Sequence, residues 1–112
     1  MRVAVIGAGA IGGWVAGRLA LAGHEVSIVA RGASAAAIRD GLTLVERNVE
    51  SIAYPHIVTD TAELQTQDVL IIAVKAPAMA DAAETSRTIV GPDTLLEPMM
   101  NGDPWRYAGA EP

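Results

Sequence analysis

A glycine motif near the start of the chain limits the possible folds more than any other part of the sequence. Gly7–Gly12 reads Gly-Ala-Gly-Ala-Ile-Gly, which is the spacing G-x-G-x-x-G. It follows Val3–Ile6, an apolar run of the kind found in strands buried on both faces. A helix is expected over Ala10–Ala22, and a second apolar run, Val26–Ala30, comes after it. A strand, a glycine turn, a helix and a second strand in this order predict the first βαβ unit of a dinucleotide-binding domain.

Each glycine of the motif has a separate task in such a site. Gly7 permits a tight turn out of the strand, Gly9 leaves room for a pyrophosphate, and Gly12 lets the helix approach the strand. The free N–H groups of the first helical turn, together with the helix dipole, attract an anion without any basic side chain. The alternative is a glycine turn that only packs a helix against a sheet. The predicted cofactor-binding residues of the motif are Gly7, Ala8, Gly9, Ala10, Ile11 and Gly12.

The rest of the chain alternates between strand-like and helix-like segments. Strands are expected at Ile57–Thr59, Val69–Val74 and Thr94–Met99, helices at Ala33–Asp40 and Ala78–Val90, a helical turn at Thr61–Gln65, and an antiparallel pair at Leu42–Glu46 and Ser51–Tyr54. This alternation predicts an α/β fold, a Rossmann-type doubly wound parallel sheet with right-handed crossovers. The predicted strand order is 3-2-1-4-5, with the antiparallel pair as a small insertion. Residues 1–112 are expected to form one domain with an irregular tail at about 103–112.

Composition excludes several classes of function. The chain has 112 residues, enough for one compact domain, and its 8 basic and 13 acidic residues give a net charge of −5. No basic run interrupts this acidity, so neither a nucleic-acid surface nor an anionic membrane surface is expected. With no Cys and two separated His residues, no metal site is expected, and a cytoplasmic location fits. The uncharged run Val3–Gly17 is interrupted by glycines and is short for a membrane span, which disfavours a signal peptide.

The residue that follows the second strand bears on the choice of dinucleotide. In NAD-binding domains, an acidic residue about 20 positions beyond the motif bonds the adenosine ribose. Arg31 occupies this place here, and Glu25 lies at the wrong end of the strand. A guanidinium can pair with a 2′-phosphate through two parallel hydrogen bonds. Arg31 therefore predicts NADP(H) as the cofactor, the alternative being an ordinary solvated loop arginine.

Several segments together resemble the ketopantoate reductase (2-dehydropantoate 2-reductase) family. They are Val5–Gly13, Leu19–Val26, Val29–Gly32, Asp68–Ala76 and Asn101-Gly102, and they extend over nearly the whole chain. The Val-Lys-Ala sequence at a strand end and the later Asn-Gly point to this family in particular. The resemblance implies NADPH-dependent reduction of the ketone of 2-dehydropantoate to pantoate, a step of pantothenate biosynthesis. It also implies that Lys75 and Asn101 face the place where nicotinamide and substrate meet, and that Arg31 contacts the 2′-phosphate.

The positions of Lys75 and Asn101 agree with such roles. Both follow predicted strands, at the carboxyl ends where open α/β sheets bind ligands. The alternatives are that Lys75 only solubilises a strand end and that Asn101 only begins an Asn-Gly turn.

The resemblance also defines what this chain is expected to lack. The family's principal proton donor is a lysine of a helical C-terminal domain, and Lys75 is the only lysine in residues 1–112. The chain by itself is therefore expected to bind NADPH without turnover. Met100 stands where many relatives have Gln, so a reductase of another small keto acid and a non-catalytic NADPH-binding module are alternatives. Apolar surface near Pro98–Tyr107 is expected to favour self-association.

Overall fold

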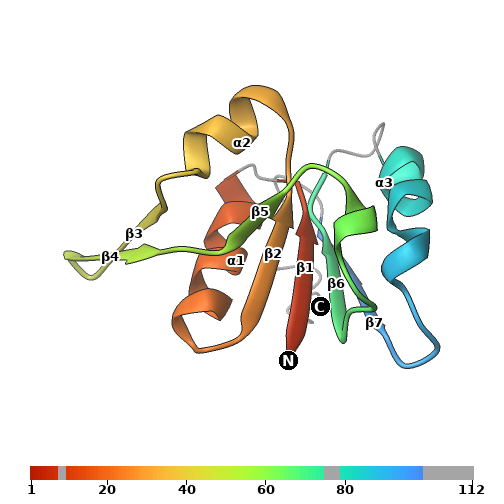
Figure 1. The fold of residues 1–112 in the computed structure, drawn as a ribbon. Coiled ribbons are helices and arrows are strands. Elements are labelled where there is room, and N and C mark those ends of the chain that lie inside the picture. Colours follow the sequence, from red (N-terminus) through yellow and green to blue (C-terminus); the bar gives the residue numbers. More distant parts are fainter. Residues whose placement is uncertain (8–9, 75–78, 100–112) are drawn as a thin grey trace, which may run out of the picture.

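The centre of the molecule is a five-stranded parallel sheet (Figure 1). The computed structural model describes residues 1–7, 10–74 and 79–99 of the chain. The strands are β1 (Arg2–Ile6), β2 (Glu25–Val29), β5 (His56–Val58), β6 (Val69–Ile72) and β7 (Leu95–Pro98). They lie in the order β5-β2-β1-β6-β7, with every neighbouring pair parallel. Counted along the chain within this sheet, the order is 3-2-1-4-5, so the predicted Rossmann-type topology is confirmed.

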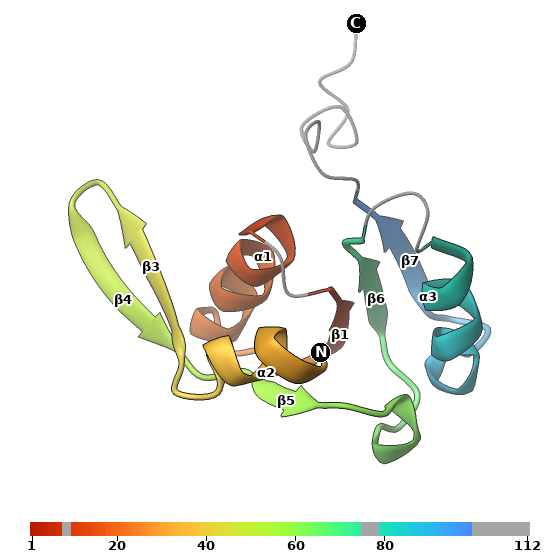
Figure 2. The ribbon, with the colours of Figure 1, turned by 90° about the horizontal axis from the view of Figure 1, so that it is seen from above.

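Helices cover both faces of this sheet. The helices are α1 (Ala10–Leu21), α2 (Gly32–Ile38) and α3 (Met79–Thr85), with the 3-10 helices η1 (Thr61–Glu63) and η3 (Ser86–Ile89). Side chains of α1 and α2 join one core cluster, and side chains of α3 and η3 join the other. Figure 2 shows α1 and α3 separated by the sheet. Within the described part of the chain, no helix is both long enough and apolar enough to cross a membrane.

The strand β1 illustrates why the predicted strands are apolar throughout. Val3 and Val5 belong to the core cluster beneath α1 and α2, whereas Ala4 and Ile6 belong to the cluster beneath α3 and η3. Successive side chains of a strand point to opposite faces. A strand covered on both sides must therefore be apolar at every position, as in the buried parallel sheets of α/β proteins.

The predicted antiparallel insertion is a hairpin of β3 (Leu42–Glu46) and β4 (Val49–Ala53), which extends from the side of the sheet (Figure 1). Its two-residue turn, Arg47-Asn48, has φ values of 52° and 65°. Two positive φ angles are typical of a type I′ turn, whose twist matches that of paired strands. This tight turn leaves no unpaired residues beside it, so β4 begins two residues before the predicted start at Ser51.

The last predicted helix differs most from the structure. The sequence predicts one helix over Ala78–Val90, but α-helical geometry ends at Thr85 and a 3-10 helix follows. The Thr61 hydroxyl donates a hydrogen bond to the Thr85 carbonyl oxygen (2.8 Å), and the Ser86 hydroxyl donates one to the Ala83 carbonyl oxygen (2.9 Å). Such hydroxyl bonds compete with the backbone ladder of a helix. The other predicted boundaries agree with the structure within two residues, and the predicted irregular tail lies outside the described residues.

Candidate dinucleotide-binding site

The candidate site lies at the carboxyl edge of the sheet, where β1, β2 and β6 end side by side. The chain leaves β1 through Gly7, whose N–H donates to the Val29 carbonyl oxygen (3.4 Å). The Ala73 N–H donates to the Ile6 carbonyl oxygen (2.8 Å), so β6 stays bonded to β1 one residue past its end. The strand itself stops before the predicted end at Val74. Open α/β sheets bind their ligands at this edge.

Gly7 has a backbone conformation and a surrounding that no other residue tolerates. Its φ is 105°, in the left-handed region where a Cβ is strained. A Cβ placed there would lie 2.4 Å from the Ala73 carbonyl oxygen and 3.0 Å from its carbonyl carbon. Both atoms belong to the backbone and cannot rotate away. The turn after β1 therefore depends on glycine at this position.

Gly12 brings the helix α1 against the same turn. A Cβ at Gly12 would lie 2.2 Å from the Gly7 carbonyl oxygen and 3.1 Å from the Ala73 Cβ. Packing alone thus requires this glycine, whether or not a ligand occupies the loop. Of the other predicted residues of the motif, Ala8 and Gly9 lie outside the described residues, and Ala10 and Ile11 begin α1.

Ala73 contacts both glycines, and the sequence analysis did not single it out. It follows the strand Val69–Ile72, whose residues are all larger. A small residue at the end of a bulky apolar run is the signal that would have identified it. Its carbonyl oxygen and Cβ set how closely the turn and α1 approach β6.

The first turn of α1 has the electrostatics of an anion site. The helix begins at Ala10, has twelve residues, and carries no acidic residue in its first turn. Its unpaired backbone N–H groups and its dipole place partial positive charge at this end. A carboxylate in the first turn would reduce that charge, and none is present. The arrangement is suited to holding a pyrophosphate without a basic side chain.

Arg31 follows β2 at the same edge of the sheet. It precedes α2 in an extended conformation (φ −134°, ψ 155°), and its side chain is exposed. Its Nε donates a hydrogen bond to the Thr59 carbonyl oxygen (3.3 Å), and this bond fixes the Nε side of the guanidinium. The three ion pairs among the described residues do not include Arg31. Its terminal amino groups are therefore not neutralised by a described carboxylate and can meet an anion.

The other predicted site residues, Lys75 and Asn101, lie outside the described residues. The strands before them are adjacent, since β6 pairs with β7 from Val69↔Leu95 to Ile72↔Pro98. No three His, Asp or Glu side chains of the described residues are grouped as metal ligands. The arrangement that the structure does show is a glycine turn, a helix start without acidic residues and an unpaired arginine at one sheet edge.

Comparison with known proteins identifies the family. A model of the family described as ketopantoate reductase PanE/ApbA matches residues 3–107. A 2-dehydropantoate 2-reductase of Mesorhizobium japonicum is 41% identical over 109 residues, which are 96% of this chain and 33% of that protein. The crystal structure of a 2-dehydropantoate 2-reductase from Porphyromonas gingivalis has a TM-score of 0.80 and 32% identity, and the match covers 91% of this chain and 39% of that one.

A more distant structural match is to a protein named for a different activity. A ternary structure of D-mandelate dehydrogenase with NADH and anilino(oxo)acetate has a TM-score of 0.77 and 25% identity, and the match covers 91% of this chain and 34% of that one. The chain spans about a third of the length of the curated relatives it matches. The family match extends over nearly all of the chain, including the glycine turn and both strand ends beside it. The chain therefore belongs to the ketopantoate reductase PanE/ApbA family.

Proposed function

We propose that this chain is the NADPH-binding part of an oxidoreductase that reduces 2-dehydropantoate to pantoate. The observation that carries the proposal is the turn at Gly7 and Gly12, closed against Ala73, in a chain of the ketopantoate reductase family. NADPH, when bound, supplies the hydride for the carbonyl carbon. The residues of this chain bind and orient the cofactor.

The described residues fit a dinucleotide. No side chain projects from Gly7 or Gly12, whose backbone lies close to Ala73. The first turn of α1 offers backbone N–H groups and carries no competing carboxylate. In this proposal the pyrophosphate is held by the motif Gly7–Gly12, including Ala8, Gly9, Ala10 and Ile11. The positive helix end stabilises its charge.

Arg31 selects NADPH over NADH in this proposal. Its guanidinium is exposed, lies beyond β2 and forms no ion pair with the described residues. A 2′-phosphate gives it a bidentate partner, whereas a 2′-hydroxyl does not. No acidic residue follows β2 to hold a ribose hydroxyl in the way of NAD-binding domains.

Lys75 and Asn101 are assigned to the nicotinamide and substrate side. Both come after the ends of neighbouring strands, β6 and β7, at the edge that carries the glycine turn. The ammonium of Lys75 is suited to polarise a ketone oxygen or to bind a carboxylate. The amide of Asn101 is suited to hydrogen-bond the substrate or the ribose on the nicotinamide side. We assign the principal proton donor to the part of the relatives that this chain does not span, so residues 1–112 bind cofactor without turnover.

Titration of the purified chain with NADPH and NADH by calorimetry tests the proposal. NADPH is expected to bind at least about tenfold more tightly than NADH, since one charge-assisted bidentate contact is at stake. Arg31→Asp is expected to abolish or invert this preference, and Arg39→Asp, another exposed arginine at the far end of α2, is the matched control. Equal affinities of the wild type for NADPH and NADH would show that Arg31 does not select the cofactor. A folded chain that binds neither dinucleotide would overturn the proposal.

A second substrate class is supported by one observation. The neighbour described as D-mandelate dehydrogenase holds NADH and anilino(oxo)acetate, a 2-oxo acid derivative with an aromatic group. That protein therefore accommodates a 2-oxo carboxylate with an aromatic group, and the other dinucleotide, on the same fold. A non-catalytic NADPH-binding module is the remaining alternative, and cofactor binding without any effect on reductase activity in the cell would favour it.

The acidic charge and the lack of Cys fit the cytoplasm as the site of action and argue against nucleic acid as a partner.

Self-association is also part of this proposal. Leu95 and Leu96 of β7, which is an edge strand of the sheet formed by the described residues, are 59% and 50% exposed, and such an edge with apolar side chains invites pairing. The chain is expected to form dimers or larger species at high concentration. Sedimentation should show this, and Leu95→Lys with Leu96→Lys should weaken it about tenfold or more. A monodisperse monomer at millimolar concentration would contradict it.

A further inference from the structure

The side chain of Arg31 is bonded to the backbone of a different segment of the chain. Its Nε, after β2, donates to the carbonyl oxygen of Thr59, after β5 (3.3 Å). The same two segments are bonded one residue earlier, where the Ala30 N–H donates to the Val58 carbonyl oxygen (3.0 Å). Arg31 and Thr59 are therefore the next residues along this parallel pair, and the side-chain bond extends the pairing of the strands.

This bond leaves one edge of the guanidinium for a bidentate partner. A guanidinium can offer an oxyanion either the edge with Nε and one terminal nitrogen or the edge with both terminal nitrogens, Nη1 and Nη2. Because the Nε–H of Arg31 donates to Thr59, the first edge is occupied. The edge of Nη1 and Nη2 takes part in no ion pair with the described residues, so it is the edge that can meet a phosphate.

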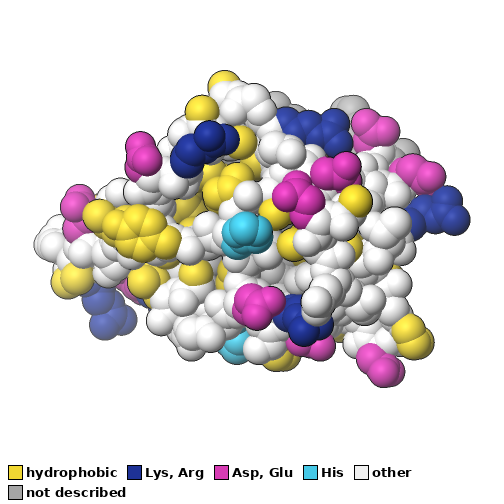
Figure 3. Space-filling model, viewed as in Figure 1, with side chains coloured by type: hydrophobic (Ala, Val, Ile, Leu, Met, Phe, Trp, Pro, Cys, Tyr) yellow, Lys and Arg dark blue, Asp and Glu magenta, His cyan; other side chains and the backbone are white. Residues whose placement is uncertain are grey.

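A free guanidinium at this place would have competing partners. The Arg31 side chain is exposed, and so are the carboxylates of Asp60 and Glu63, which form no ion pair within the described part of the chain. Figure 3 shows acidic and basic side chains, with a histidine, on the face that carries β5 and η1. A long side chain also loses rotamer freedom when a ligand orders it. A bond that fixes Nε before the cofactor arrives reduces this cost.

The peptide group that carries the Thr59 oxygen is fixed from both sides. On one side, Val58 is buried and paired with Val29 of β2. On the other side, Asp60 caps η1, and its Oδ1 accepts a hydrogen bond from the Ala62 N–H (2.9 Å). The φ of Asp60 is −137°, and this angle sets the plane of the peptide between Thr59 and Asp60. A capping residue keeps such an extended conformation while its side chain bonds the helix start.

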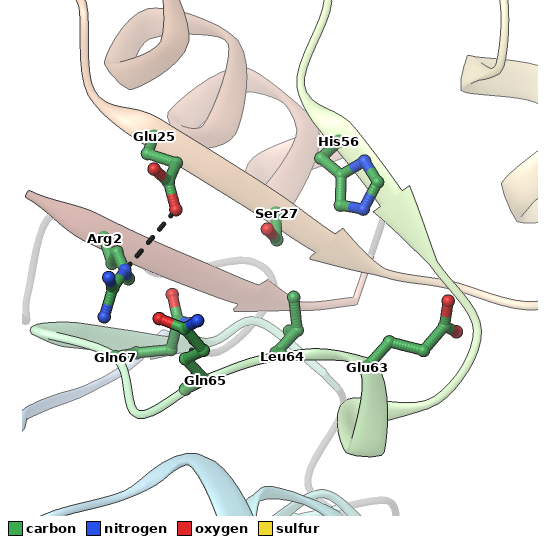
Figure 4. Close-up of a pocket in the computed structure, with 8 residues that line it drawn as sticks. All are labelled: Arg2, Glu25, Ser27, His56, Glu63, Leu64, Gln65 and Gln67. Atoms are coloured by element: carbon green, nitrogen blue, oxygen red, sulfur yellow. Dashed lines mark hydrogen bonds and ion pairs between the residues drawn. The ribbon is translucent and has the colours of Figure 1, made fainter.

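The 3-10 helix η1 is itself anchored to the rest of the molecule. Thr61 is only 4% exposed, and its hydroxyl donates to the Thr85 carbonyl oxygen of α3. Figure 4 shows η1 with Glu63 and, across a short connection, β5 with His56. This connection therefore runs from a paired strand to a fastened helical turn, and its carbonyl groups have little freedom to reorient.

We propose that Asp60 is a positioning residue for the selection of NADPH, a role that rests on the function proposed above. Its cap bond fixes the Thr59 carbonyl oxygen, this oxygen holds Nε of Arg31, and the edge of Nη1 and Nη2 is presented to the 2′-phosphate. The same bond directs the Asp60 carboxylate to the Ala62 N–H and away from the guanidinium. Asp60 touches neither cofactor nor substrate in this role.

Titration of Asp60→Ala with NADPH and NADH by calorimetry tests the proposal. Alanine cannot cap η1, so the Thr59 oxygen and the Arg31 side chain lose their fixed positions. NADPH is expected to bind about threefold to tenfold more weakly, which is the cost of ordering one long side chain. NADH, which has no 2′-phosphate, is expected to bind as it does to the wild type. A merely structural defect would weaken both dinucleotides alike, and an unchanged ratio of the two affinities would overturn the proposal.

Two further variants separate the cap from the charge. Asp60→Asn removes the charge but keeps an oxygen that can cap η1, so the preference for NADPH is expected to stay. Asp40→Ala removes the same charge from an exposed position after α2 and is expected to leave both affinities unchanged. A loss of preference in either variant as large as that in Asp60→Ala would overturn the role of the cap.

The bond of Arg31 can also be followed without any cofactor. In ¹H–¹⁵N NMR of the chain, the Arg31 Nε–H is expected to exchange with water more slowly in the wild type and in Asp60→Asn than in Asp60→Ala. Equal exchange in all three would overturn the proposal. Equal affinities of the wild type for NADPH and NADH would overturn the function proposed above and this role with it. A wild-type preference that persists in Asp60→Ala would overturn this role alone.

Discussion

The two sides of the helix α1 pack in different ways, although both use glycine. Toward the sheet, Gly12 meets backbone, because a Cβ there would lie 2.2 Å from the Gly7 carbonyl oxygen. Toward the hairpin, Gly17 meets a side chain, because a Cβ there would lie 2.9 Å from Cδ1 of Leu44. Backbone atoms cannot move without moving the turn, whereas a leucine can change rotamer. The same residue type is therefore indispensable on one side of the helix and replaceable on the other.

The largest effect is expected for Gly12→Ala. The added methyl group overlaps the Gly7 carbonyl oxygen, so α1 must move away from β1 and the turn must open. We expect the free energy of unfolding to fall by about 3 kcal/mol or more, the range of strong overpacking. Urea denaturation followed by far-UV circular dichroism measures this, and NADPH binding should be lost with it. A variant as stable as the wild type would show that the turn is more adaptable than its contacts indicate.

A smaller effect is expected for Gly17→Ala on the hairpin side. Alanine favours a helix over glycine by about 1 kcal/mol, but the buried Leu44 must shift to admit the methyl group. The two effects oppose each other, so stability is expected to stay within about 1 kcal/mol of the wild type. Urea denaturation of the Gly17→Ala variant measures this change in stability, and its affinity for NADPH is expected to equal that of the wild type. A loss as large as that of Gly12→Ala would remove the distinction between the two sides of α1.

An effect of opposite sign to that of Gly12→Ala, and much smaller, is expected for Gly13→Ala. The nearest atom to a Cβ there is Cδ2 of Leu42 at 3.6 Å, an ordinary van der Waals contact. The variant gains helix propensity without a clash, and we expect a stabilisation of about 0.5 to 1 kcal/mol. A higher midpoint of urea denaturation would confirm it. Destabilisation would mean that the hairpin lies closer to α1 than this contact indicates.

Much of the fold was predictable from the sequence, because its elements carry local signals. The apolar run of β1, the glycine motif after it and the residues Arg47-Asn48 each report a local backbone conformation. Strand order followed from the alternation of strands and helices, and the hairpin was expected where it lies. The end of α3 was not predictable, since it depends on a hydroxyl of Thr61, 24 residues earlier in the chain.

Some residues of the candidate site were likewise predictable from local sequence, whereas others were not. The sequence predicted the motif Gly7–Gly12 and Arg31 as site residues by spacing alone, and these assignments, like the roles of Lys75 and Asn101, stay predictions. Ala73 was missed, because its importance arises from contacts with Gly7 and Gly12 more than 60 residues away. A groove that includes Arg2, Glu25 and His56 in its lining was also missed, since these residues start separate strands that adjoin only in the sheet.

By itself, the sequence determined the class of fold, the glycine turn and the cation that follows the second strand, because each depends on residues close together in the chain. Only the tertiary structure decided which glycines are indispensable, where the last helix changes geometry, and that the polar side chain of Ser27 is buried in the sheet. These depend on which faces of distant segments meet. A pattern of residue types along one segment does not contain that information, whereas close packing in the folded chain makes it decisive.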